Sequence, residues 1–76
     1  MDMKEIFPGI VINGGIYQGK PVIKGTRVLV EVIVGHLAAG DSIDQIVEEY
    51  KIKREDVLVA LQYASKIVSG ETVMVQ

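Results

Sequence analysis

The period of the hydrophobic pattern changes near residue 30, and this change constrains the fold more than any other feature. From Ile10 to Val30, short β-branched runs alternate with glycine-containing turns, a pattern typical of short strands. After residue 30, apolar residues recur every three or four positions, as they do on one side of a helix. The sequence therefore predicts a mainly α fold, in which short N-terminal strands or a hairpin precede a helical unit.

Two segments of the first part predict turns. Asn13-Gly14 is a strong turn dipeptide because both residues tolerate positive φ. The Lys24-Gly25-Thr26 segment has the length and the central glycine of a three-residue hairpin loop. We expect the short strands around these turns at residues 10–12, 16–17, 22–23 and 27–29.

The second part predicts three helices with the lengths of a helix-turn-helix unit. The first helix covers about residues 31–39, ends at a left-handed glycine and is apolar on more than one side. The second helix, 43–50, begins with the capping box Ser42-Ile43-Asp44-Gln45. The third helix covers residues 54–69. Its expected core stripe is Val57, Leu61, Ala64 and Val68, with Leu58 and Ile67 adding to it.

The chain of 76 residues predicts a single domain, divided into a Gly-rich β segment (10–30), a three-helix unit (31–70) and a tail (71–76) with β character. A core this small gives a modest stability. The chain has no cysteine and one histidine, so disulfides and thiolate metal sites are excluded. Association with another copy is the remaining route to stability, and we expect a homodimer or a higher homo-oligomer.

The same features suggest a location. The N-terminus lacks the basic and apolar regions of a signal peptide, and no apolar run approaches the length of a membrane helix. The absence of cysteine fits a reducing compartment. We therefore expect a cytoplasmic protein without membrane contact.

Residues for catalysis or cofactor binding are sparse. Gly14 to Lys20 matches the first seven positions of a phosphate-binding loop, but the eighth position is Pro21, which has no hydroxyl for a metal. His36 has no serine or carboxylate at a spacing typical of a general base, so a partly exposed helix residue is expected. The acidic residues form no metal-loop pattern. We expect no cofactor, no metal and no enzymatic activity.

One basic cluster lies at the turn between the second and third helices. Lys51, Lys53 and Arg54 could contact DNA phosphates there, with Gln62 facing outward on the third helix. The net charge of −2 and the acidic start of that helix oppose contact with a polyanion. DNA binding and a solvated turn with no contact therefore remain two alternatives.

A second basic cluster surrounds the predicted hairpin loop. Lys20, Lys24 and Arg27, together with Thr26, could bind an acidic protein pocket or a phosphate. Alternatively, the segment is a structural turn in which Gly25 supplies the φ angle and Thr26 caps the loop. Both interpretations stay open from the residues alone.

Several blocks, read in order, resemble one family. They are residues 19–28 (GKPVIKGTRV), Leu37 to Gly40, Arg54 to Val57 and Ala60 to Ala64. The family is catalogued as domain of unknown function 433. The resemblance implies a homeodomain-like helix-turn-helix fold and a role as a prokaryotic antitoxin paired with a small PIN-like ribonuclease toxin. It marks as its signature Gly19, Lys20, Pro21, Gly25, Thr26 and Arg27.

The active sites of PIN-like nucleases are acidic and hold a divalent metal, so the resemblance implies that Lys24 or Arg27 inhibits by inserting there. The expected function is an antitoxin-like protein that neutralises such a toxin, with autoregulatory DNA binding as a second activity. The alternatives are a stand-alone transcriptional regulator and a structural dimerisation module. The chain departs from the family at Leu29, where proline is common, and at residues 51–53, where the missing cap weakens the third helix by about 0.5–2 kcal/mol.

Overall fold

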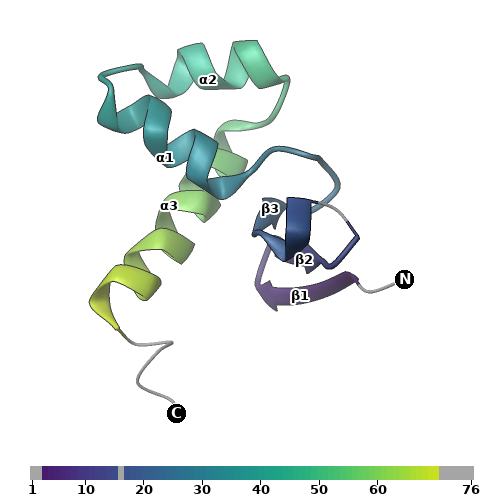
Figure 1. Cartoon of the computed structure of the whole chain (residues 1–76). Helices are drawn as coiled ribbons and strands as arrows, with labels where there is room; N and C mark the ends of the chain where they lie inside the picture. The colour runs from purple at the N-terminus through teal and green to yellow at the C-terminus, as the bar shows by residue number, and fades with distance from the viewer. Residues whose placement is uncertain (1–2, 16, 71–76) are drawn as a thin grey trace.

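The computed structural model describes residues 3–15 and 17–70, and it has three short strands followed by three helices (Figure 1). The elements in chain order are β1 (Met3–Phe7), β2 (Ile10–Asn13), the 3-10 turn η1 (Tyr17–Gly19), β3 (Val22–Ile23), α1 (Val30–Ala38), α2 (Ile43–Tyr50) and α3 (Arg54–Ser69). The mainly α fold with an N-terminal β element is confirmed.

The three strands form one antiparallel sheet in the order β1-β2-β3. The first strand was not predicted. The adjacent charged residues Lys4 and Glu5 interrupt any regular alternation of apolar and polar residues in it. Only Phe7, at its end, is half-buried. A shift of register between Glu5 and Phe7 further interrupts its pairing with β2. This strand is therefore held mainly by its backbone bonds to β2.

Other details of the β segment differ from the expectation. Tyr17 lies in η1 with a φ of 53° rather than in a strand, and Ile16 is outside the described residues. The predicted strand at 27–29 is reduced to a single bridge between Leu29 and Val22.

The turn at Asn13-Gly14 is present, but positive φ does not form it, because neither residue has a left-handed backbone. Instead, the side-chain oxygen of Asn13 accepts a hydrogen bond of 2.9 Å from the backbone N–H of Gly15. This is the local bond through which asparagine favours turns.

The ends of the helices follow the local signals closely. Ser42 and Gln45 form both bonds of the predicted capping box, at 2.7 and 3.1 Å. Gly40, with a φ of 98°, follows α1, and Gly70, with a φ of 84°, ends α3. The predicted tail at 71–76 lies outside the described residues.

The start of α3 is better capped than the sequence indicated. Lys53 has no side-chain acceptor for the helix amides. However, the Asp56 carboxylate reaches back and accepts a hydrogen bond of 3.0 Å from the backbone N–H of Lys53. One of the two bonds of a capping box is thus formed, and it offsets part of the expected weakening.

One apolar core joins the sheet to the helices. Its buried members are Ile10, Ile23, Val30, Ile33, Ile46, Ile52, Val57 and Ala60. The helix α3 is central to this core, because it contacts α1, α2 and β2. The edge of the Phe7 ring also meets the ring of Tyr63, with the centroids 5.6 Å apart.

The predicted core stripe of α3 is wrong at its C-terminal end. Val68 is 86% exposed, whereas Ala60, outside the predicted stripe, is fully buried. Leu58 and Ile67, which were expected to add to the core, are also exposed, at 40% and 38%. The reason is that the last turns of α3 project beyond α1 and α2 (Figure 1), so the apolar periodicity continues where no neighbouring helix covers it.

The first helix buries Val30 and Ile33, while Val34 and Leu37 pack against the same core. Val32 is only half-buried. Among the described residues, none of the helices combines the length and the apolar character needed to cross a bilayer.

We expect Ile33→Ala to lower the free energy of unfolding by about 2–5 kcal/mol, because it leaves a cavity in a fully buried site. Urea denaturation measures this change. The matched control Val32→Ala, on the same helix, should cost about 1 kcal/mol or less. Equal losses for the two variants would contradict the described core.

Candidate interaction surfaces

The signature segment folds into a tight turn that Thr26 closes. Its hydroxyl donates to the carbonyl oxygen of Ile23 at 2.8 Å and accepts from the backbone N–H of Val28 at 2.9 Å. Gly25 supplies the positive φ, at 81°, which a side chain would oppose. The structural interpretation of Gly25 and Thr26 is therefore confirmed, and the Thr26 hydroxyl is committed to the turn.

Backbone bonds fix the turn to the rest of the protein. The N–H of Ile23 donates to the carbonyl of Val28 at 2.9 Å, and the N–H of Val30 donates to the carbonyl of Pro21 at 3.0 Å. These bonds place Ile23 and Val30, on the two sides of the turn, in the same core. The turn is thus a supported element rather than a loose loop.

Lys24 is held by an acidic residue from β1. Its ammonium lies 3.1 Å from Glu5 Oε1, and Glu5 Oε2 accepts a bond of 2.8 Å from the backbone N–H of Gly9. The Gly9 bond, followed by the bond from Lys24, lowers the pKa of Glu5 below its ordinary value of 4.5. Glu5 therefore stabilises the fold in its charged form, and this contribution disappears as the pH falls through its lowered pKa.

Lys20 is also paired. Its ammonium lies 3.4 Å from Glu31 Oε2 at the start of α1, and both side chains are at least half exposed. An ion pair this exposed contributes roughly 0–1 kcal/mol to the free energy of unfolding. Breaking the pair with Glu31 would therefore lower the stability only slightly.

Arg27 differs from the two lysines. Its side chain is exposed, and within residues 3–15 and 17–70 no carboxylate lies at ion-pair distance from it. The guanidinium has five donors in a planar fork that matches a carboxylate. Of the predicted contact residues around the signature turn, Arg27 is the one whose charge is available to a partner.

The second predicted cluster lies at the turn between α2 and α3. Lys51 has a left-handed backbone with a φ of 57°, and Lys51 and Lys53 are exposed. Arg54 pairs with Asp44 on α2 at 3.5 Å. The side chains of Lys51 and Lys53 therefore extend into solvent. The acidic residue Glu55, in the first turn of α3, is also exposed and lies close to them in sequence.

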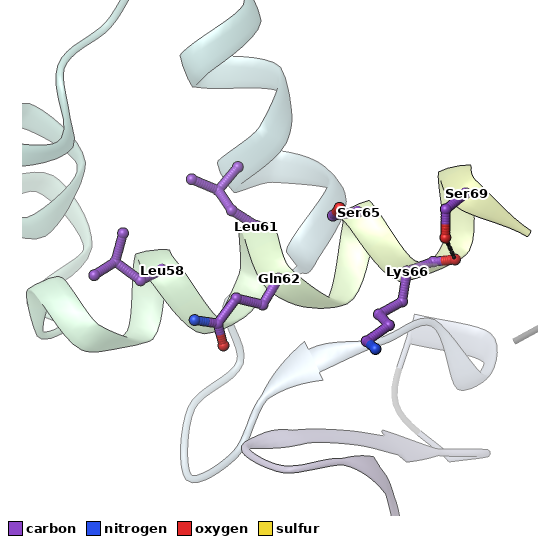
Figure 2. Close-up of a pocket in the computed structure, with 6 residues that line it drawn as sticks. All are labelled: Leu58, Leu61, Gln62, Ser65, Lys66 and Ser69. Carbon is purple, nitrogen blue, oxygen red and sulfur yellow. Dashed lines mark hydrogen bonds between the residues drawn. The ribbon is translucent and has the colours of Figure 1, made fainter. Parts of the chain in front are cut away.

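Gln62 lies on a shallow groove along the outward face of α3 (Figure 2). The groove is lined by Leu58, Leu61, Gln62, Ser65, Lys66 and Ser69. Leu58 is 40% exposed, although exposure of an apolar side chain to water is unfavourable. This mixture of apolar and small polar residues is more typical of a protein contact than of a phosphate contact.

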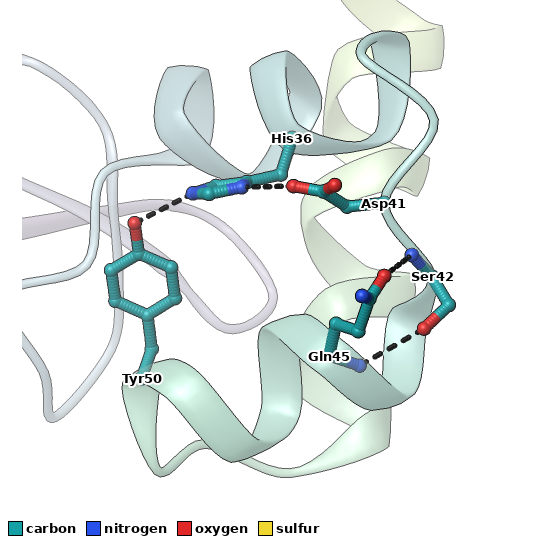
Figure 3. A network of polar contacts seen from close by, with 5 residues as sticks. All are labelled: His36, Asp41, Ser42, Gln45 and Tyr50. Atoms are coloured by element: carbon teal, nitrogen blue, oxygen red, sulfur yellow. Dashed lines mark hydrogen bonds and ion pairs between the residues drawn. The ribbon is translucent and has the colours of Figure 1, made fainter.

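A polar network that was not predicted involves His36 (Figure 3). Its Nδ1 lies 2.6 Å from Asp41 Oδ2, and its Nε2 lies 2.7 Å from the Tyr50 hydroxyl. An ionised carboxylate only accepts, so Nδ1 donates to Asp41 and, in the neutral ring, Nε2 accepts from Tyr50. His36 is a partly exposed helix residue, as expected, but the spacing of residues in the sequence did not predict that the Asp41 carboxylate lies beside its ring.

The His36 network connects the last turn of α1, the loop after it and the end of α2. The chain reverses at Gly40 and brings Asp41 back to the ring of His36. The sequence separation of the two residues alone does not predict this contact. Both ring nitrogens are occupied by bonds within the chain. The network therefore acts as a brace between two helices.

Within residues 3–15 and 17–70, no group of three or more His, Asp or Glu side chains is arranged to hold a metal ion. Two surfaces on this part of the chain carry exposed polar and charged side chains, namely the signature turn and the outward face of α3.

We expect Thr26→Val to lower the free energy of unfolding by about 1–3 kcal/mol, because the Val28 N–H loses its acceptor in a half-buried turn. Chemical denaturation at constant m-value measures this loss. Arg27→Ala, one residue away, should stay within about 0.5 kcal/mol of the natural chain. A Thr26→Val variant as stable as the natural chain would show that the turn does not depend on the hydroxyl.

Comparison with known proteins gives one match. No curated protein and no solved structure matches the chain. One family model, described as Protein of unknown function (DUF433), matches residues 10–64, which is well over half of the chain and includes both the signature turn and most of α3. The chain therefore belongs to the DUF433 family.

Proposed function

We propose that this chain is an antitoxin-like protein that binds and neutralises a PIN-like ribonuclease. The resemblance noted from the sequence suggests the class of partner, and the family match is compatible with it. The proposed contact is the signature turn, with Arg27 entering the acidic, metal-binding pocket of the nuclease.

The observation that carries the proposal is the exposed Arg27 on a turn that is already built. Thr26 and the backbone satisfy the polar groups of the turn internally. A partner therefore meets a pre-formed guanidinium and pays little to order the backbone around it. Because an arginine binds carboxylates through two parallel hydrogen bonds, it suits a pocket lined by acidic metal ligands.

Lys20 and Lys24 have a secondary role in this proposal. Each already neutralises a carboxylate of its own chain, Glu31 and Glu5 respectively. They attract an acidic surface at long range only weakly, since each pair is close to neutral as a unit. Specific binding is assigned mainly to Arg27.

DNA binding ranks second. Lys51 and Lys53 are exposed at the turn before α3 and could contact phosphates. The acidic Glu55 and the exposed Leu58 lie on the face of α3 that would enter a groove, and a negative charge there opposes a polyanion. The same positions do not hinder a protein partner.

We expect Arg27→Glu to weaken binding to a PIN-like nuclease encoded beside this chain's gene by roughly 30-fold or more, because the substitution places like charges together in a desolvated contact. Co-expression followed by titration calorimetry measures the affinity. Inhibition of RNA cleavage by the purified nuclease gives a second readout.

Lys51→Glu is the matched control, because it makes the same charge change on an exposed side chain of the other basic cluster. It should retain the affinity of the natural chain. Loss of binding with Lys51→Glu and not with Arg27→Glu would move the contact to the helix-turn-helix. Failure of the natural chain to form any complex would overturn the proposal.

A further inference from the structure

Glu5, Gly9 and Lys24 form a closed ring of three contacts at the signature turn. The Glu5 carboxylate accepts from the backbone N–H of Gly9 at 2.8 Å. The carbonyl of Gly9 accepts from the backbone N–H of Lys24 at 2.9 Å. The Lys24 ammonium closes the ring, because it donates to the second oxygen of Glu5 at 3.1 Å. The ring therefore joins β1, the turn after it and the signature turn.

The backbone around Gly9 holds this ring in place. Pairing of Ile10 with Ile23 continues the ladder of β2 and β3 as far as the bond between Gly9 and Lys24. Gly9 has a φ of 88°, which a side chain would oppose, and an added Cβ would lie 3.0 Å from Val59 Cγ1 on α3. The fold thus keeps the Glu5 carboxylate within reach of Lys24 before any partner binds.

The other lysine of the signature segment has a less organised acidic partner. Lys20 lies 3.4 Å from Glu31. Within residues 3–15 and 17–70, no backbone N–H donates to the Glu31 carboxylate. Glu5 is oriented by the Gly9 amide, whereas Glu31 must be ordered by the lysine itself. Of the two carboxylates, Glu5 therefore holds its lysine more firmly.

We propose that Glu5 is an internal ligand of Lys24, which takes the place of a partner's carboxylate and withholds this lysine from an acidic surface. The inference rests on the proposed function, in which the signature turn meets an acidic pocket. A partner's carboxylate binds Lys24 only by displacing Glu5, whereas Arg27 needs no such exchange.

Two members of the ring, Glu5 and Gly9, precede residues 10–64, which the family model matches. The restraint on Lys24 is therefore set by residues outside the matched segment.

A double-mutant cycle with a hexa-aspartate peptide tests this inference without a nuclease. We expect Glu5→Gln to lower the dissociation constant for the peptide about three- to fivefold, since it frees Lys24 from an exposed and therefore weak ion pair. Glutamine keeps an oxygen that accepts from Gly9, so the turn remains. NMR titration at roughly 0.1 M salt, where distant charges are screened, gives the constants, and circular dichroism verifies the fold.

The same change in a Lys24→Met chain is the decisive comparison. There Glu5→Gln should alter the dissociation constant by less than about twofold, because only the general charge changes and no lysine is released. Glu31→Gln is the matched control, because it removes the same charge from the other ion pair. It should also alter the constant by less than about twofold.

The ring has a readout that needs no ligand. The bond from Gly9, followed by the bond from Lys24, lowers the pKa of Glu5 below 4.5. Lys24→Met should therefore raise the pKa of Glu5, while the remaining Gly9 bond keeps it below 4.5. Carbon NMR of the side-chain carboxyl group follows this titration.

Four results would refute the inference. They are an equal effect of Glu5→Gln with and without Lys24, an equal effect of Glu31→Gln, a Glu5→Gln chain that does not bind the peptide, and a pKa of Glu5 that Lys24→Met leaves unchanged. Failure of the natural chain to bind a nuclease would instead remove the proposed function. The peptide cycle would still decide whether Glu5 withholds Lys24.

Discussion

The hydroxyl of Thr26 is the interaction on which the rest of the N-terminal half depends. It is bonded on both sides, to Ile23 and to Val28, and so it closes the turn that joins β3 to the approach of α1. With that turn closed, Ile23 and Val30 enter one core with residues of all three helices. In this chain the signature turn is thus, in the first place, a folding element.

The cations around the same turn differ in how far their charges are paired within the chain. Lys20 and Lys24 were predicted from the sequence as contact residues, but they form ion pairs with Glu31 and Glu5, respectively. Arg27 lies beside the Thr26 bonds and remains exposed. A pre-formed turn with an exposed guanidinium supports the proposed binding to an acidic pocket.

Local signals in the sequence were sufficient for the helices. The capping box at Ser42 and Gln45, the glycine ends and the apolar periodicity each act within one or two turns, so the bounds of α2 and α3 could be predicted. The exposure of Val68 could not, because it depends on where α1 and α2 cease to cover α3. The strand β1 was missed because its charged residues show no alternation and its pairing with β2 is fixed by the tertiary structure.

The polar contacts of the site also divide into local ones, which the sequence could predict, and contacts that depend on the tertiary structure. The Thr26 turn was predicted as one of two alternatives, since its bonds join residues only two or three positions apart. The Lys24–Glu5 and Lys20–Glu31 pairs join residues that are distant in sequence, and they became visible only with the fold. The His36–Asp41 bond depends on the reversal of the chain at Gly40, which a spacing pattern does not contain.

The proposed function requires that the signature turn is formed before any partner arrives. Amide hydrogen exchange of the isolated chain, followed residue by residue with NMR, tests this claim most directly, because an amide bonded within a stable turn exchanges only when the turn opens. We predict that the amides of Ile23, Thr26 and Val28 are protected, since each donates within the turn, while that of Gly25 exchanges rapidly. Rapid exchange at all four amides would show that the turn is not stably formed in the isolated chain, and would contradict this claim.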